Sequence, residues 1–178
     1  MIYFTADLHL DHENIIRHCK RPFSGVAEMN RALIDNWNAT VTAWDEIYIL
    51  GDLTMRPAPV AHGYLSRMCG KKYFIRGNHD KFLNDFEPYE RDFIWVKDYF
   101  VLKHSGRKFV LFHYPIAEWD GYFRGAVHLY GHIHNSRTSG ERANAAGGLA
   151  FNVGVDVNGF RPVSIDAIMS MAEAREQQ

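Results

Sequence analysis

The hydrophobic positions of the chain fall into short apolar runs separated by longer stretches with helical periodicity. Residues 2–7, 46–52 and 71–78 are short and rich in isoleucine, tyrosine and phenylalanine, as expected for buried strands. Residues 26–41 instead carry apolar side chains at helical spacing: Met29, Leu33, Trp37 and Val41. The strand–helix–strand order predicts a mostly parallel sheet covered by helices, because parallel neighbours need crossover connections.

The second half of the chain follows a different pattern. Residues 95–115 contain two apolar runs about Ser105 and Gly106, which predicts an antiparallel hairpin with its turn at these two residues. Two further strands and a final helix, capped by Ser164, are expected at residues 126–133, 149–157 and 165–178. Because no repeat, low-complexity tract or linker divides the sequence, we expect a single domain over residues 1–178.

Composition narrows the class of protein. A chain of 178 residues with 47% hydrophobic and 14% aromatic residues can build a core, which excludes a disordered protein. A formal net charge of -1 gives no global attraction to nucleic acid or to an anionic membrane. Cys19 and Cys69 fall in expected helices without disulfide or metal-ligand spacing, which favours reduced thiols. With no signal segment or membrane-spanning apolar run, we expect a soluble, cytoplasmic protein.

Polar side chains with metal-binding chemistry follow most of the expected strands. In chain order, the strand ends carry D-x-H at 7–9, G-D at 51–52, G-N-H-D at 77–80, a histidine at 113 and G-H-I-H at 131–134. Ligands of open α/β sheets bind beyond the carboxyl ends of the strands. We therefore expect these groups to gather in one region of the molecule.

Two of the motifs place potential ligands two residues apart. Because side chains alternate along a strand, His132 and His134 should share one face, as should Asp7 and His9. Such a pair is either two partly exposed histidines or two ligands of one metal centre. Seven candidate ligands are too many for one ion, and would fill two sites roughly 3.5 to 4 Å apart that share a carboxylate. They are Asp7, His9, Asp52, Asn78, His113, His132 and His134.

The donor types restrict the ion. Oxygen and nitrogen donors without thiolates suit manganese, iron, zinc, cobalt or nickel, and they argue against a structural zinc site. We expect two divalent ions, with manganese as the first choice.

The ordered set DxH, GD, GNHD, H and GHxH resembles the calcineurin-like metallophosphoesterase family, from Asp7 to His134. The resemblance implies an α/β fold, a four-layer αββα sandwich of two mixed sheets flanked by helices. It implies one metal held by the residues at 7, 9, 52 and 134, and a second held by those at 52, 78, 113 and 132. It also implies that His79 meets the phosphoryl group or the leaving oxygen, and that Asp80 orients His79.

The reaction implied is hydrolysis of a phosphate ester by a hydroxide shared between the metals, with His79 protonating the leaving group. We expect phosphodiesters to be preferred, because binding a monoester dianion usually takes a cluster of arginines that the motif segments lack. Candidate substrate contacts are His12, Asn14, Arg17, Arg21, Arg76 and Trp119, with Arg124 a further candidate. Trp119 could stack a nucleobase or fill the core. The remaining histidines are assigned surface or structural roles: His18, His62, His104 and His128.

Three alternatives remain open from sequence. The enzyme could be a phosphomonoesterase of the same fold. The stretch ADLHLDH partly matches HxHxDH, which hints at a two-metal hydrolase of the metallo-β-lactamase type, although that family has no GD and GNHD strand ends. A metal-binding scaffold without activity would be expected to lack a ligand or the catalytic histidine, and none is missing. The expected partner is a small phosphate ester or nucleotide, without membrane or nucleic acid, and the oligomeric state is open.

Overall fold

The computed structural model describes residues 1–84, 89–136 and 148–177. Its first sheet has the strand order β4-β3-β2-β1-β9. Strands β1 to β4 run parallel, and β9 pairs antiparallel with β1. The bounds of these strands are β1 (Ile2–Thr5), β2 (Glu46–Ile49), β3 (Lys71–Ile75), β4 (Trp95–Lys97) and β9 (Val163–Ser164).

Within the described residues, the second sheet has the strand order β5-β6-β7-β8, in which β5 is antiparallel to β6 and the other pairs are parallel. Their bounds are β5 (Tyr99–His104), β6 (Arg107–Phe112), β7 (Val127–Tyr130) and β8 (Leu149–Asn152). Both sheets are therefore mixed, which confirms the fold class that the sequence predicts.

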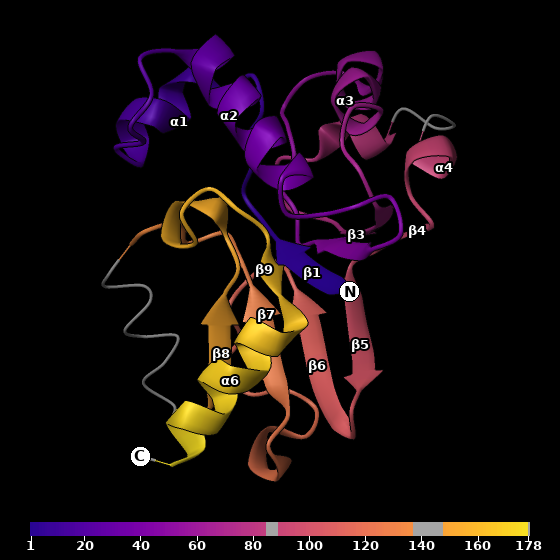
Figure 1. Ribbon diagram of the computed structural model, residues 1–178, viewed down its shortest axis with the longest axis vertical. Coiled ribbons are helices and arrows are strands. Elements are labelled where there is room, and N and C mark those ends of the chain that lie inside the picture. The colour runs from indigo at the N-terminus through magenta and orange to yellow at the C-terminus, as the bar shows by residue number, and fades with distance from the viewer. Residues whose placement is uncertain (85–88, 137–147, 178) are drawn as a thin grey trace.

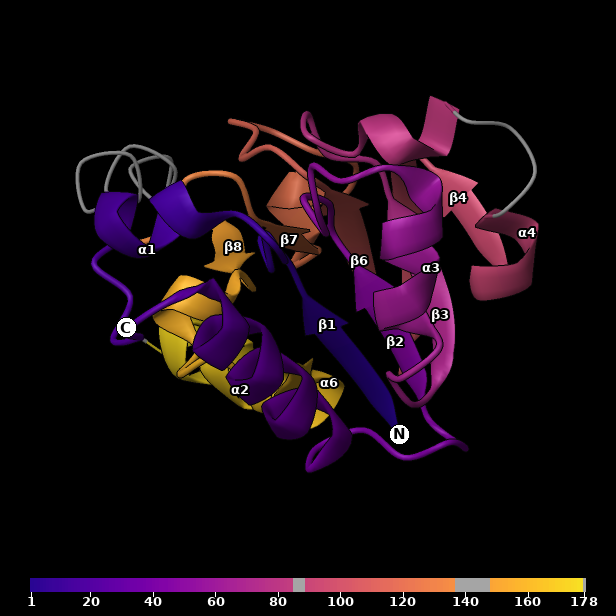
Figure 2. The same ribbon diagram turned by 90° about the horizontal axis from the view of Figure 1, so that it is seen from above.

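Helices cover the outer face of the first sheet (Figures 1 and 2). Apolar side chains of α1, α2 and α3 pack there against strand residues such as Ile47 and Phe74. In α2 the buried positions include Met29, Leu33 and Trp37, as the helical spacing predicts. The helices are α1 (Glu13–His18), α2 (Val26–Asn38), α3 (Ala58–Leu65), α4 (Tyr89–Asp92) and α6 (Ile165–Glu176), with 3₁₀ turns η1 (Lys81–Asn84), η2 (Tyr122–Arg124) and η3 (Val155–Val157).

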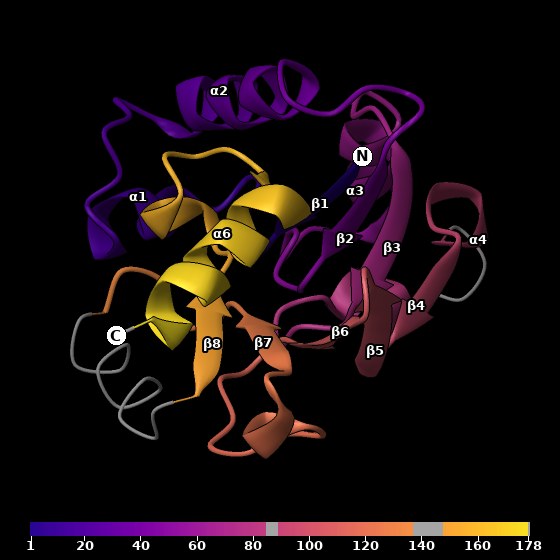
Figure 3. The same ribbon diagram turned by 60° about the horizontal axis from the view of Figure 1, so that its bottom comes forward.

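A second core fills the space between the two sheets. Phe4 and Leu50 of the first sheet pack there with Phe109 and Leu129 of the second. Helix α6 adds Ile168 to this core and contacts β1, β8 and β9, so it lies along one edge of the sandwich (Figure 3). The Ser164 hydroxyl accepts a 3.2 Å hydrogen bond from the Ala167 amide, which confirms the expected cap of α6.

The expected hairpin over residues 95–115 is only partly correct. Strand β4 joins the first sheet parallel to β3, and the chain enters the second sheet only at β5. The hairpin that forms is β5–β6, and its turn residues Ser105 and Gly106 have φ of 47° and 78°. Two consecutive positive φ values match the turn type that suits the twist of antiparallel strands.

The two cysteines also differ from expectation in their positions. Cys19 and Cys69 lie just beyond the ends of α1 and α3 rather than inside helices. Both thiols are free, as expected. Within the described residues, no helix is long and apolar enough to span a membrane.

Candidate metal centre

The seven candidate ligands lie where strands of both sheets end. Strands β1, β2 and β3 of the first sheet lead to Asp7, Asp52 and Asn78, and β6 and β7 of the second lead to His113 and His132. Within each sheet, a backbone hydrogen bond joins the loops that follow neighbouring strands. The Asp7 amide donates to the Gly51 carbonyl at 3.0 Å, and the Gly131 amide donates to the His113 carbonyl at 2.9 Å.

The backbone of the ligand loops is left-handed. Five candidate ligands have positive φ, namely Asp7 (59°), His9 (50°), Asp52 (56°), His132 (67°) and His134 (49°). Strands β1 and β7 end at Thr5 and Tyr130, so neither two-residue pair lies on a strand. The expectation that His132 and His134 share a strand face is therefore wrong. The left-handed loop sends the two imidazoles to different groups of ligands.

Asp7, His9 and His134 form the first group, with ligand atoms within 4.8 Å of one another. Both carboxylate oxygens of Asp7 accept from the His132 amide, at 3.0 and 2.9 Å. Burial opposes the charge on His134, but the hydrogen bonds with Asp156 and Cys19 and the charge of Asp7 together outweigh burial and raise the pKa of His134 to about 10. We call this group, together with Asp52, site 1.

Asp52, His113 and His132 form the second group. The Asn78 amide oxygen lies 3.0 Å from His113 Nε2 and 3.0 Å from His132 Nδ1, so it completes this group. His113 Nδ1 lies 2.7 Å from the Leu50 carbonyl, which fixes the ring and leaves Nε2 facing the group. We call these four residues site 2.

One carboxylate lies between the two groups. Asp52 Oδ2 is 3.5 Å from His9 Nε2 and 3.6 Å from His113 Nε2. Its other oxygen, Oδ1, accepts from the His79 amide at 2.9 Å. Asp52 is therefore the residue that is placed to serve both sites.

The donor set fits divalent ions. Both ring nitrogens of His9 are buried without a hydrogen-bond partner among the described residues, which leaves an electron pair for a cation. Burial lowers the pKa of His9 to about 2, so this imidazole is neutral. Burial also raises the pKa of Asp7 to about 7, which indicates that the carboxylate needs a positive charge beside it.

The Asp80 side chain is hydrogen-bonded to the backbone. Its carboxylate accepts from three backbone amides, those of Asp52 (2.8 Å), Leu53 (2.9 Å) and Gly77 (2.7 Å). These are the hydrogen bonds that the described residues give the Asp80 side chain, and none involves the imidazole of His79. Asp80 therefore fixes the loop that carries Asp52.

Glycine is required where the loops cross. A Cβ at Gly77 would lie 2.6 Å from the Asp52 amide and 2.9 Å from Asp80 Oδ2. We expect Gly77→Ala to displace the Asp52 loop, weaken Mn²⁺ binding and lower the free energy of unfolding by about 1–3 kcal/mol. The control is Gly63→Ala in α3, where a Cβ meets nothing within 4 Å. This variant should raise the free energy of unfolding by up to about 1 kcal/mol. Urea unfolding and Mn²⁺ titration measure both effects, and wild-type Mn²⁺ binding by the Gly77 variant would contradict the expectation.

A pocket of about 300 Å³ opens beside site 1. Its lining combines two ligands with residues of the α1 segment: His9, His12, Asn14, Ile15, His18, His79 and His134. His79 faces His9 edge-on, with ring centroids 5.5 Å apart. The expected substrate contacts His12 and Asn14 are therefore near the centre. His18, for which we expect a surface or structural role, also lines the pocket, and its four-residue spacing from Asn14 on one helix face is the signal for this placement.

Three other expected substrate contacts do not line this pocket. The Arg21 side chain has no exposed surface and pairs with Asp156, so it does not reach the pocket. Trp119 is buried against Tyr122 and donates to the Ala126 carbonyl at 3.0 Å, so it belongs to the core. Arg76 extends to Asp98 at 3.4 Å, and 40% of its side chain is exposed.

Cys19 belongs to a third group that the sequence does not predict. Its sulfur lies within 4.8 Å of ligand atoms of His134 and Asp156. Both carboxylate oxygens of Asp156 already bind the Arg21 guanidinium, at 2.8 and 2.9 Å. A second cation there would be repelled by this buried positive charge.

Comparison with known proteins identifies a family whose model matches the part of the chain that carries these motifs. The model of the family described as calcineurin-like phosphoesterase matches residues 1–136, a stretch that contains all seven candidate ligands. The chain belongs to the calcineurin-like phosphoesterase family. Membership supports metal-dependent hydrolysis of phosphoesters and a phosphoester substrate, and it replaces the metallo-β-lactamase interpretation of the first motif.

Relatives of this chain match three quarters or more of its length. The uncharacterized protein MJ1445 of Methanocaldococcus jannaschii is 37% identical over 174 residues, covering 97% of this chain and 91% of that protein. The Gene 66 protein of Mycobacterium phage D29 is 28% identical over 159 residues, covering 75% of this chain and 78% of that protein. The crystal structure of AQ665 from Aquifex aeolicus, a protein of unknown function, superposes with a TM-score of 0.79 at 26% identity, covering 96% of this chain and 98% of that one.

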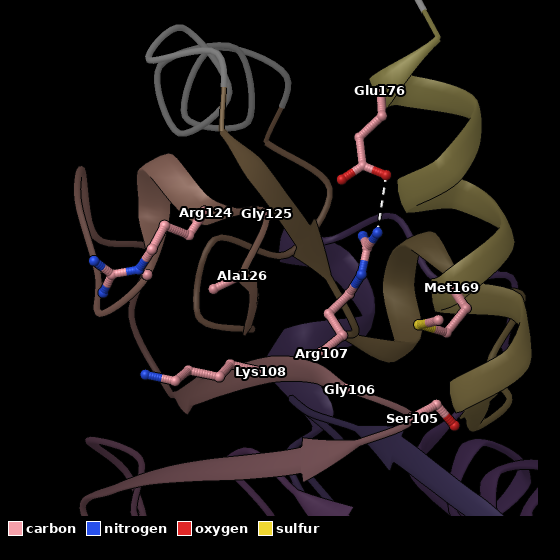
Figure 4. Close-up of a pocket in the computed structure, with 10 residues that line it drawn as sticks. Ser105, Gly106, Arg107, Lys108, Arg124, Gly125, Ala126, Met169 and Glu176 are labelled. Atoms are coloured by element: carbon pink, nitrogen blue, oxygen red, sulfur yellow. Dashed lines mark hydrogen bonds and ion pairs between the residues drawn. The ribbon is translucent and has the colours of Figure 1, made fainter.

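The phosphoesterase has a larger cavity, of about 480 Å³, at the other end of the second sheet (Figure 4). It lies beside the starts of β6 and β7, whereas the candidate ligands follow the ends of these strands. Its cations have carboxylate partners: Arg107 pairs with Glu176 at 2.9 Å, and Lys108 and Arg124 both approach Asp120. Arg124 is therefore remote from the metal centre.

Proposed function

We propose that this protein is a binuclear metal-dependent phosphoesterase that acts on phosphodiesters. The observation that carries the proposal is the placement of Asp52 Oδ2, 3.5 Å from His9 and 3.6 Å from His113, between two groups of ligands. Divalent ions in such a centre activate water and neutralise charge on a phosphoryl group. The oxygen and nitrogen donors suit manganese first, with iron, zinc, cobalt and nickel as alternatives.

His79 is the proposed proton donor to the leaving group. Its amide is bonded to Asp52 Oδ1 at 2.9 Å, so the residue is attached to the carboxylate that serves both sites. Its imidazole lines the pocket beside site 1, and it belongs to none of the groups of potential metal ligands among the described residues. An imidazole in this place can give a proton to an oxygen that departs from phosphorus.

The arrangement of arginines favours diesters. The pocket lining contains histidine, asparagine and isoleucine side chains but no arginine among the described residues. Arg21 is buried behind site 1, and the Arg17 guanidinium donates to Asn14 in an exposed position at 3.0 Å. A monoester dianion usually needs bidentate arginines, whereas a diester carries less charge and has a second substituent for the pocket to contact.

Hydrolysis of two nitrophenyl substrates tests the preference. With Mn²⁺ loaded identically, we expect kcat/KM for bis(nitrophenyl) phosphate to exceed that for nitrophenyl phosphate by about tenfold or more, about 1.4 kcal/mol in transition-state stabilisation. Nucleotide diesters and monoesters should follow the same order. A preference for monoesters in both pairs would indicate a phosphomonoesterase. Bound metal without turnover of any of these esters would indicate a scaffold.

A further inference from the structure

Arg21 lies directly behind site 1, although it contacts no substrate pocket. Its guanidinium donates to Asp156 Oδ1 at 2.8 Å through Nε and to Oδ2 at 2.9 Å through Nη2. It also donates to the Asp7 carbonyl at 2.7 Å and to the Leu8 carbonyl at 2.9 Å. One buried cation therefore binds both the D-x-H loop and a carboxylate 135 residues further along the chain.

Asp156 in turn holds a ligand of site 1. Its Oδ2 lies 2.8 Å from His134 Nδ1, and 1% of the Asp156 side chain is exposed. An imidazole that donates Nδ1–H to a carboxylate keeps Nε2 as its lone-pair nitrogen and becomes a stronger metal ligand. Arg21 and Asp156 thus link Asp7 and His134 through one continuous set of hydrogen bonds.

Site 2 has no equivalent charged support in the part of the chain that the structure describes. The ring of His113 is held by the neutral Leu50 carbonyl at 2.7 Å. The Nδ1 of His132 faces the Asn78 side chain, which is a ligand of the same site. The two sites therefore differ in the charge behind their histidines.

We propose that Asp156, held in place by Arg21, is a positioning residue that makes site 1 the tighter of the two metal sites. The inference rests on the two-metal centre proposed above. Asp156 lies in η3, outside the residues 1–136 that the family model matches. A purely structural ion pair would instead affect the stability of the fold and leave the difference between the sites unchanged.

The test is Mn²⁺ titration by calorimetry, with thermal unfolding of the metal-free protein recorded in parallel. We expect the wild type to bind two Mn²⁺ ions with unequal affinities. Asp156→Ala should weaken only the tighter step, by about 10–100-fold, the usual range for loss of an outer-shell partner. Asp156→Asn retains a hydrogen-bond acceptor for His134, so it should restore part of the affinity. His134→Ala serves as the reference for loss of site 1.

A matched control and a double variant separate metal positioning from folding. Asp92→Ala removes a comparable pair, His62 Nδ1 to Asp92 Oδ1 at 2.8 Å, that contacts no candidate metal ligand, and it should leave both Mn²⁺ affinities unchanged. Replacing both partners of a buried ion pair with apolar residues often preserves stability. Arg21→Met combined with Asp156→Leu should therefore keep the fold and still weaken the tighter site.

The outcomes distinguish the inference from the proposed function. A wild-type protein that binds fewer than two Mn²⁺ ions would overturn the two-metal centre, and the inference with it. Two bound ions in the wild type, with both affinities unchanged or equally reduced in Asp156→Ala, would overturn the inference alone. If Asp156→Ala does not fold, the double variant decides by the same criteria.

Discussion

Asp52→Asn is expected to lose Mn²⁺ from both sites and to reduce kcat/KM by on the order of 10³-fold or more, because the bound ions contribute several kcal/mol of charge stabilisation. The substitution keeps the size of the side chain and removes the negative charge that lies between His9 and His113. His134→Ala should instead weaken mainly one ion, because His134 belongs to one group only. Metal analysis after gel filtration, combined with diester hydrolysis, measures both effects.

The control for Asp52→Asn is Asp120→Asn. Asp120 is half exposed and pairs with Lys108 near the second cavity, so the same chemical change there should leave Mn²⁺ content and turnover at wild-type values. Two tightly held ions and normal turnover in the Asp52 variant would show that Asp52 does not bridge the sites.

The second large effect is expected at His79. If His79 donates a proton and binds no metal, the His79→Asn variant should keep two Mn²⁺ ions and the fold. Its kcat should fall by about 10² to 10⁴-fold. The loss should be smaller for nitrophenyl esters than for alkyl esters, because nitrophenolate departs without needing a proton. Measurement of kcat for both ester types on the Mn²⁺-loaded protein tests this difference.

His62→Asn is the matched control for His79→Asn. His62 lies in α3, is partly exposed and pairs with Asp92, so its replacement should leave the rate on both ester types unchanged. Loss of one ion in the His79 variant would instead identify His79 as a ligand. An equal loss of rate for nitrophenyl and alkyl esters would contradict its role as a proton donor.

The sequence predicts the strand ends well because a short apolar run that stops at a polar residue is a local signal. Asp7, Asp52, Asn78 and His113 each follow such a run, and the structure brings them together. The assignment of strands to two sheets is not local. Nothing in residues 95–104 indicates that β4 pairs with β3 and that β5 crosses to the other sheet after Asp98, because that choice depends on packing partners far along the chain.

The errors at the site have similar causes. The sequence predicts that Arg21, which follows a short helix, contacts the substrate, yet Asp156, 135 residues later, makes its burial favourable. Alternation along a strand fails for His132 and His134 because their backbone is left-handed, a conformation that a histidine in the sequence does not predict. Asp156 itself could have been found, since it follows the apolar run of β8 just as the other acidic residues follow theirs.

The left-handed loops have a consequence for anyone who wishes to graft this metal centre onto another scaffold. Five candidate ligands adopt positive φ, and none can be replaced by glycine without losing its donor atom. At about 1–2 kcal/mol for each such residue, the five together cost roughly 5–10 kcal/mol, which approaches the whole stability of a typical domain. A transplant that copies only the ligand types to the strand ends of a new sheet would let the backbone relax and the donor atoms separate. The loop hydrogen bonds, the glycines and the buried carboxylate of Asp80 have to be transferred with the ligands.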